Sequence, residues 1–167
     1  MHSISSQIEI DAPPETVWAI LTDFGAYPAW SPFLERIEGP LEPGARLRVR
    51  LQPPGGAGIT LRPRLLAVSP PHELRWLGRL GLPWIFDGEH RFEISTTAEG
   101  RARFVQAETF RGLLVPLLPT ARRRAEAGFG QFNAALKARA EAQAPSLAAA
   151  TRAATSTGSH TGENGGA

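Results

Sequence analysis

Apolar and polar side chains alternate through most of the chain between residues 34 and 110. From Arg46 to Leu51, leucine and valine share one face while three arginines share the other. Similar runs occupy residues 3–10, 34–40, 59–68, 72–80, 84–95 and 101–110. Alternation with a period of two is typical of a strand that buries one face. The pattern therefore predicts an antiparallel sheet with one covered apolar face and one solvated, arginine-rich face.

Two segments carry helical periodicity instead. Residues 11–24 contain paired prolines near their start and then an apolar stripe, which predicts a short helix. Residues 25–33, punctuated by Gly25, Pro28 and Pro32, predict a second short helix or turn. From Thr120 to about Glu141, apolar residues recur at steps of three and four, which predicts a long helix. Gly128 and Gly130 lie inside it, and each lowers helix stability by roughly 1 kcal/mol relative to alanine. We therefore expect close packing, or space for a bound group, at these glycines.

The segment from Ala144 onward is small, polar and nearly free of large apolar residues. Such a segment buries too little surface to offset the entropy lost when it becomes ordered. We therefore predict a single domain over residues 1–143 and a disordered tail over residues 144–167.

Composition narrows the function classes. The chain has 167 residues, of which 42% are hydrophobic and 20% charged, as in ordinary globular domains. The absence of cysteine excludes disulfides and thiolate chemistry, and no histidine has a partner at metal-ligand spacing, so we expect neither a metal nor another cofactor. With no signal peptide and no apolar run long enough to cross a bilayer, we predict a cytoplasmic protein. A formal net charge of +2 is too small to indicate a nucleic-acid partner.

The order of elements predicts an α+β helix-grip, in which a curved antiparallel sheet wraps around a long C-terminal helix. Several segments, in this order, resemble the SRPBCC superfamily, also called START-like or polyketide cyclase/dehydrase-like. They are IDAPPETVWAILTDFGAYPAWSPF, PGARLRV, LRWLGRL, GEHRFEI, AETFRGLLVPLL and FGQFNAALKARAE. The resemblance covers residues 3–141.

The resemblance implies a cavity between the sheet and the long helix. Members of this superfamily hold lipids, polyketides, sterols or other apolar molecules there; some are cyclases or dehydratases, and others transport quinones or lipids. Our leading hypothesis is therefore binding, transport or sequestration of a hydrophobic or aromatic small molecule such as a lipid, quinone or polyketide. Fold alone does not define the activity. The oligomeric state stays open, and so does a peripheral membrane contact, which the sequence by itself does not support.

Alternation and helical periodicity identify the side chains expected to face this cavity. Aromatic residues dominate the set, a composition shared by small-molecule sites and by ordinary protein cores. The expected lining is Trp18, Trp30, Phe33, Trp76, Trp84, Phe86, His90, Phe92, Ile94, Phe104, Gln106, Glu108, Phe110, Phe129 and Phe132.

His90 is the candidate for chemistry, because it lies on the apolar side of the run GEHRFEIS. With a tight turn centred at Glu99, His90 would pair with Glu108 across a hairpin, and Phe92 with Gln106. A carboxylate beside the imidazole would favour its protonated form and fix its tautomer. Three hypotheses follow: acid/base catalysis of cyclase or dehydratase type, hydrogen bonding to a ligand, or a mutually satisfied polar pair. The residue types favour a partnered cavity residue over a catalyst.

The arginines of the outer sheet face suggest an interaction surface as a further hypothesis. They are Arg46, Arg48, Arg50, Arg62, Arg64, Arg75, Arg79, Arg91 and Arg103. A basic face of this kind suits RNA, anionic lipid or an acidic partner. Glutamates such as Glu73, Glu89 and Glu93 interleave with them, which favours a solvated face. The apolar run RGLLVPLLPT before the long helix is either a lid over the cavity mouth or the start of that helix.

Overall fold

The computed structural model describes residues 2–79, 84–117 and 119–157, without the side chains of residues 117, 121 and 145–157. A five-stranded antiparallel sheet has the order β1-β8-β7-β6-β5, and a three-stranded antiparallel sheet, the small sheet, has the order β2-β3-β4. The strands are β1 (His2–Ile10), β2 (Leu34–Glu38), β3 (Arg48–Leu51), β4 (Ile59–Leu61), β5 (Arg64–Ser69), β6 (Glu73–Arg79), β7 (Asp87–Thr96) and β8 (Ala102–Arg111). The helices are α1 (Pro14–Thr22), η1 (Phe24–Ala29), η2 (Val115–Leu117) and α2 (Pro119–Thr157).

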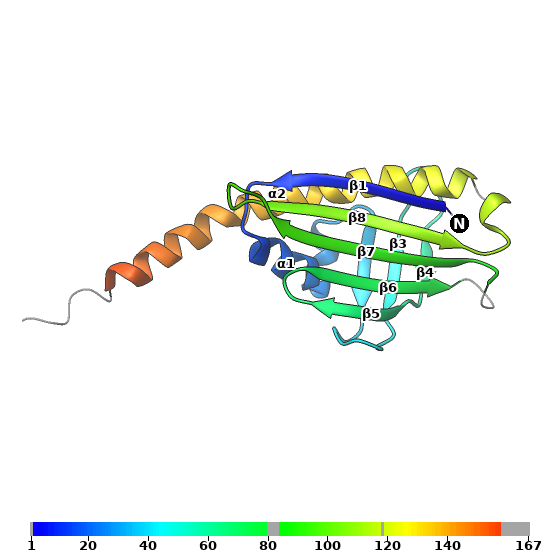
Figure 1. The fold of residues 1–167 in the computed structure, drawn as a ribbon, viewed down its shortest axis with the longest axis horizontal. Helices are drawn as coiled ribbons and strands as arrows, with labels where there is room; N and C mark the ends of the chain where they lie inside the picture. The colour runs from blue at the N-terminus through cyan, green and yellow to red at the C-terminus, as the bar shows by residue number, and fades with distance from the viewer. Residues whose placement is uncertain (1, 80–83, 118, 158–167) are drawn as a thin grey trace, which may run out of the picture.

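Helix α2 runs beside β1, and α1 packs against it; the small sheet lies behind the five-stranded sheet in Figure 1. The apolar side chains of both sheets therefore face a shared interior. This arrangement confirms the expected α+β helix-grip.

One expected strand divides between the two sheets. Residues 59–68 form β4 and β5, because Pro63 lies between them and lacks the N–H that a ladder position requires. The Pro63 carbonyl oxygen instead accepts a hydrogen bond from the Leu47 N–H at 2.9 Å. The N–H of Leu65 donates to the carbonyl oxygen of Ala45, also at 2.9 Å. The chain thus turns from the small sheet into the five-stranded sheet at this corner.

Helix α2 continues to Thr157, beyond the end expected near Glu141, and its last turns project past the sheets in Figure 1. The alanine-rich sequence of this extension favours helix without help from burial. The segment predicted to be a disordered tail, residues 144–167, therefore begins as helix. Residues 158–167 lie outside the described residues, and the domain boundary at residue 143 stays a prediction.

An aromatic cluster holds α2 against the five-stranded sheet. The ring of Phe132 lies between 5.3 and 6.3 Å, centroid to centroid, from those of Tyr27, Trp30, Phe92 and Phe104. Aromatic pairs at such distances contribute about 0.5–1.5 kcal/mol each beyond the burial of their area. The cluster joins η1, β7, β8 and α2 into one core.

Tyr27 is the only tyrosine of the chain, and its side chain is fully buried in this cluster. Its hydroxyl donates a hydrogen bond to the Leu21 carbonyl oxygen at 2.7 Å. Burial raises the pKa of the Tyr27 hydroxyl far above its usual range, and the nearby Asp23 carboxylate adds to the rise. The hydroxyl therefore stays protonated in the folded protein where an exposed tyrosine ionises.

Gly128 brings α2 close to the loop before β2. A Cβ atom at Gly128 would lie 2.3 Å from a ring carbon of the buried Phe33 side chain. Gly130 differs, because a Cβ atom there would have no neighbour within 4 Å. The expected close packing is therefore present at Gly128, where the glycine provides space for the Phe33 ring.

We expect Gly128→Ala to destabilise the protein by about 1–3 kcal/mol, because the added methyl group overlaps a buried ring. Gly130→Ala is the matched control and should stabilise it by up to about 1 kcal/mol, since alanine is the better helix former. Chemical denaturation measures both free energies of unfolding. Equal stabilisation by the two substitutions would show that Phe33 does not pack on Gly128.

The ionisation of Tyr27 gives a second test of the core. The neutral hydroxyl is favoured by the fold, so the stability that it provides is present below about pH 10, the unfolded pKa, and is lost as the pH rises further. We expect no tyrosinate absorbance from the native protein until it unfolds in alkali. An absorbance step near pH 10 with the fold intact, as judged by circular dichroism, would contradict this burial.

Candidate functional site

His90 lies in an aromatic setting at the centre of the five-stranded sheet. Its side chain points into the interior from β7, and the residue is 5% exposed. Ring centroids of Phe92, Phe129 and Trp76 lie 4.4, 5.1 and 5.3 Å from that of the imidazole. The alternation of β7 places His90 on this face, as the sequence predicts.

The cross-strand register of the β7–β8 hairpin is the predicted one. His90 pairs with Glu108, and Phe92 pairs with Gln106, which confirms the tight turn near Glu99. Oε2 of Glu108 lies 3.7 Å from Nδ1 of His90. That distance permits an ionic contact but is too long for a good hydrogen bond.

The hydrogen-bond partner of His90 is Gln106 rather than Glu108. Nε2 of Gln106 lies 3.0 Å from Nε2 of His90, and an amide nitrogen can only donate. The imidazole Nε2 therefore accepts, and in the neutral ring the proton lies on Nδ1, on the side of Glu108. The sequence predicts that the direct cross-strand partner, Glu108, fixes the tautomer, whereas in the structure the diagonal neighbour Gln106 does so.

Gly88 of β7 makes room for the Glu108 carboxylate. A Cβ atom at Gly88 would lie 2.7 Å from Oε1 of Glu108. The carboxylate can thus lie over the bare backbone of the neighbouring strand, on the interior side of the sheet. Its side chain keeps 19% of its surface accessible, more than the 6% of the His90 side chain.

An open cavity of about 410 Å³ lies where the small sheet, the end of β8 and the first turns of α2 meet. Its walls are mainly apolar. They include Phe33, Leu51, Ile59, Leu61, Phe86, Phe110, Val115 and Ala125. Three charged side chains, those of Glu108, Arg122 and Arg124, also line it.

A second, much smaller space of about 40 Å³ lies deeper in the molecule, and His90 and Trp76 are among its lining residues. The two spaces share Phe33, Leu51, Leu61, Phe86 and Glu108. Glu108 therefore lies at the boundary between the outer cavity and the inner space. The inner space holds about one water-sized group, so only a small substituent of a ligand fits beside His90.

The expected lining residues divide into cavity walls and core. Phe33, Phe86, Glu108 and Phe110 line the outer cavity, while Trp76 and His90 line the inner space. The remaining expected residues, apart from Trp84, belong to the core or pack on it without lining either space. They are Trp18, Trp30, Phe92, Ile94, Phe104, Gln106, Phe129 and Phe132.

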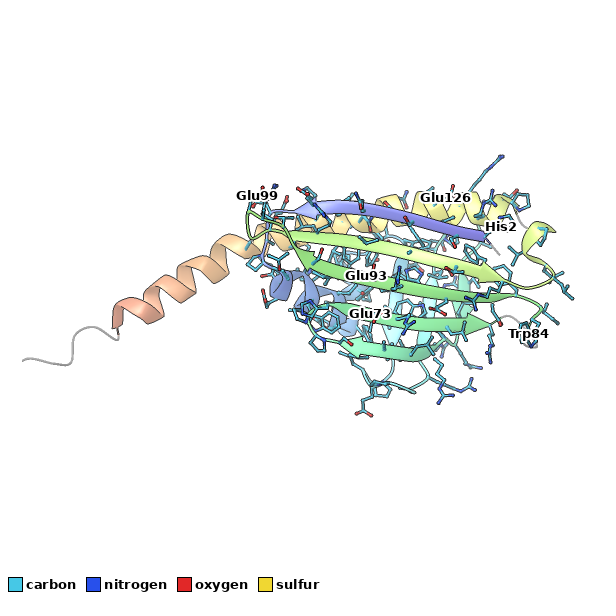
Figure 2. All side chains as sticks on the ribbon, in the orientation of Figure 1. His2, Glu73, Trp84, Glu93, Glu99 and Glu126 are labelled. Atoms are coloured by element: carbon cyan, nitrogen blue, oxygen red, sulfur yellow. The ribbon has the colours of Figure 1, made fainter. Side chains whose placement is uncertain are left out.

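The prediction that Trp84 faces the cavity is wrong. Trp84 is 77% exposed and has a positive φ of 73°, and Figure 2 shows it at the end of the five-stranded sheet. The prediction extended the alternation of β7 back to residue 84, but the strand begins at Asp87. Before that point the chain turns, so the parity of a strand no longer gives the direction of a side chain.

Part of the cavity wall was not anticipated. Pro53, Gly56 and Ala57 in the β3–β4 loop line the outer cavity, as do Arg122 and Arg124 from the start of α2. The glycine-rich sequence PPGGAGIT, residues 53–60, is typical of a hairpin loop, and residues 52–58 do connect β3 to β4. Its place in the cavity wall depends on how the small sheet sits against α2, which no local pattern encodes.

The arginines of the five-stranded sheet are largely paired with carboxylates. Arg75 contacts Glu73 at 3.2 Å and Glu89 at 3.3 Å, and Arg91 contacts Glu93 at 3.3 Å. Figure 2 shows Glu73 and Glu93 on this sheet. The observation supports a solvated face on this sheet over a basic interaction surface.

Two negative findings concern the described residues alone. Within them, no three His, Asp or Glu side chains gather as metal ligands. Nor is any helix of the described ranges long and apolar enough to span a membrane.

A protein family described as "Polyketide cyclase / dehydrase and lipid transport" matches residues 1–141. The chain belongs to this family. The match confirms the predicted membership of the START-like superfamily, and family membership points to hydrophobic ligand binding or cyclase activity. A search of curated proteins gives no significant match.

Three solved structures resemble this member of the polyketide cyclase/dehydrase and lipid transport family. Protein MLL2253 from Mesorhizobium loti is 22% identical with a TM-score of 0.65, and the match covers 81% of this chain and 94% of that one. A START superfamily protein from Mycobacterium smegmatis is 22% identical with a TM-score of 0.67, covering 84% and 98%. The ZhuI aromatase/cyclase from Streptomyces sp. R1128 is 19% identical with a TM-score of 0.66, covering 85% and 94%. Similarity at these identities establishes the shared fold alone.

Proposed function

We propose that this protein binds a hydrophobic small molecule with an aromatic or extended apolar body, of the lipid, quinone or polyketide kind. The observation that carries the proposal is the outer cavity of about 410 Å³, whose walls are mainly apolar and aromatic. Its volume falls in the range of about 300–1,000 Å³ that is typical of small-molecule sites. Family membership supports the same ligand class.

The position of the polar groups suggests how the ligand is oriented. The apolar body would lie between Phe33, Phe86 and Phe110, where burial of its surface is favourable by roughly 25 cal/mol per Å². A neutral hydroxyl or carbonyl substituent would point toward Glu108 and the inner space at His90. In such a site, a small number of polar groups at fixed positions orients the ligand and provides specificity.

The proposal predicts that a large side chain in the cavity blocks binding. Ala125→Trp would project into the outer cavity, and we expect it to lower ligand affinity at least about tenfold, a change of 1.4 kcal/mol. Ala134→Trp, at an exposed position of the same helix, is the matched control and should bind like the unchanged protein. Native mass spectrometry, before and after organic extraction, identifies molecules carried through purification, and titration with a panel of lipids, quinones and aromatic polyketides gives the affinities. An empty protein that binds no member of this panel would contradict the proposal.

Catalysis of the cyclase or dehydratase type is the second candidate. It rests on the His90–Glu108 pair, because the carboxylate reaches the outer cavity while the imidazole stays behind it. In this reading the carboxylate of Glu108 takes a proton from a carbon next to a ligand carbonyl. The Nδ1–H of His90 then stabilises the negative charge that develops on the carbonyl oxygen.

The two candidates differ in what Glu108→Gln does. If the protein is an enzyme, this nearly isosteric change should lower turnover by about 10²–10⁴-fold and leave ligand affinity within a few-fold. Glu99→Gln, which alters an exposed carboxylate in the hairpin turn, is the control. Turnover that survives both Glu108→Gln and His90→Ala would exclude the acid/base role of this pair, whereas the absence of turnover in the unchanged protein would leave binding as the function.

A further inference from the structure

Exposed apolar side chains gather on two adjacent loops at one end of the molecule. Leu113 is 81% exposed, Trp84 is 77% exposed and Leu114 is 42% exposed. Among large apolar residues of the described ranges, only Ile59 and Leu66 are also counted as exposed. Trp84, Leu113 and Leu114, here called the apolar tip, lie just before β7 and just after β8.

Backbone hydrogen bonds hold the apolar tip together. The Leu113 N–H donates to the Trp84 carbonyl oxygen at 3.0 Å, and the Leu114 N–H donates to the Ile85 carbonyl oxygen at 3.1 Å. Gly112 makes this approach possible: its φ is +128°, and a Cβ atom there would lie 2.4 Å from the Ile85 carbonyl oxygen. The fold therefore fixes these side chains in an exposed position, although their burial elsewhere would be favourable.

Basic residues flank the apolar tip in the sequence. The sequence from Phe110 to Ala125 contains four arginines and no carboxylate. Arg111 and Arg123 are exposed, and Arg122 and Arg124 line the outer cavity. Asp87, which faces Arg111 across the β7–β8 ladder, already contacts Arg79 at 3.4 Å.

The apolar tip also adjoins the wall of the outer cavity. Val115, the residue after Leu114, lines this cavity together with the half-exposed Ile59. The cavity, the apolar tip and the arginines thus belong to one end of the molecule.

We propose that this end of the protein docks on the surface of an anionic lipid bilayer. Trp84, Leu113 and Leu114 insert among the lipid head groups and upper acyl chains, and Arg111 and Arg123 contact anionic head groups. Tryptophan and leucine beside basic residues are the combination that binds proteins to membrane interfaces. Each arginine near an anionic surface contributes about 1 kcal/mol.

The shape of the tip favours a bilayer over a protein partner. A stable protein interface buries about 800 Å² per partner and involves some 20–30 residues of each, far more than three side chains on two loop ends provide. A protruding tip suits a fluid surface that closes around it. Because only a few side chains insert, the attachment is reversible and leaves the rest of the protein in water.

Membrane docking does not depend on which ligand the cavity binds. It adds to the proposed ligand binding a direction in which the outer cavity opens. When the apolar tip is inserted, the mouth of the outer cavity faces the bilayer. A hydrophobic molecule then passes between bilayer and cavity without crossing water.

Vesicle co-sedimentation of the full chain tests the proposal. We expect binding to phosphatidylcholine vesicles that contain about one-third phosphatidylglycerol, weak binding to pure phosphatidylcholine, and weaker binding at higher salt. Leu113→Glu should lower the affinity at least about tenfold, because it places a carboxylate among the lipids. Leu66→Glu is the matched control: Leu66 is 39% exposed on β5, and its replacement should leave binding unchanged.

A pair of charge reversals tests the location. Arg111→Glu with Arg123→Glu should lower the affinity at least about tenfold. Arg48→Glu with Arg62→Glu makes the same change of net charge on and beside the small sheet, and should have little effect. The fluorescence of Trp84 gives direct contact information: vesicles should shift the emission of the unchanged protein to shorter wavelength, and Trp84→Phe should abolish the shift.

Several results would overturn the proposal. They are the absence of vesicle binding, equal losses from the two charge-reversal pairs, and full binding by a folded Leu113→Glu protein. Binding of an acidic protein at the same residues, without any vesicle binding, would replace the membrane with that partner.

Circular dichroism and thermal unfolding of each variant identify any loss of binding that comes from misfolding. If the Leu113→Glu protein does not fold, Leu113→Ser replaces it with the same expected result. Failure of this test leaves ligand binding in the cavity untouched, because that is measured without lipid vesicles.

Discussion

The Phe33 ring lies against the bare backbone of Gly128, and much of the architecture depends on this contact. It determines how closely the start of β2 approaches α2, and so how the small sheet stands relative to the long helix. Phe33 also lines both the outer cavity and the inner space. The contact between Phe33 and Gly128 therefore sets the shape of the pocket. A substitution at either residue that changes the pocket also changes the stability of the protein.

The parts of the fold that follow from local rules could be predicted from the sequence. Alternation locates the strands, and the length of one turn is sufficient to place His90 opposite Glu108. Alternation continues across Pro63 from Ile59 to Leu65, so it does not reveal that Pro63 divides this run between two sheets. Burial reasoning likewise overlooked the helix in residues 144–157, because an alanine-rich segment can be helical without a core.

The site was predictable to a smaller extent, for a related reason. Parity indicates which side of a strand a residue faces, but it does not distinguish a cavity wall from solid core, as Phe92 and Phe110 illustrate. It also fails where a strand ends, which is why Trp84 was misplaced. The hydrogen bond between Gln106 and His90 is diagonal across the ladder, so only the positions of atoms reveal it. The walls supplied by the β3–β4 loop depend on packing between distant segments.

Glu108 and the arginines of α2 give the cavity an electrical polarity along its length. The carboxylate lies at the inner end, where Arg79 of the inner lining is already paired with Asp87 at 3.4 Å, and the guanidinium groups of Arg122 and Arg124 belong to the outer cavity alone. An amphiphile with an anionic end, such as a fatty acid, is repelled from the inner end and attracted to the mouth. If such a molecule is a ligand, this charge distribution favours its binding with the tail inward, whereas a neutral alcohol or ketone meets no such barrier head first. The distribution of charge thus makes the cavity selective for the orientation in which a charged amphiphile enters.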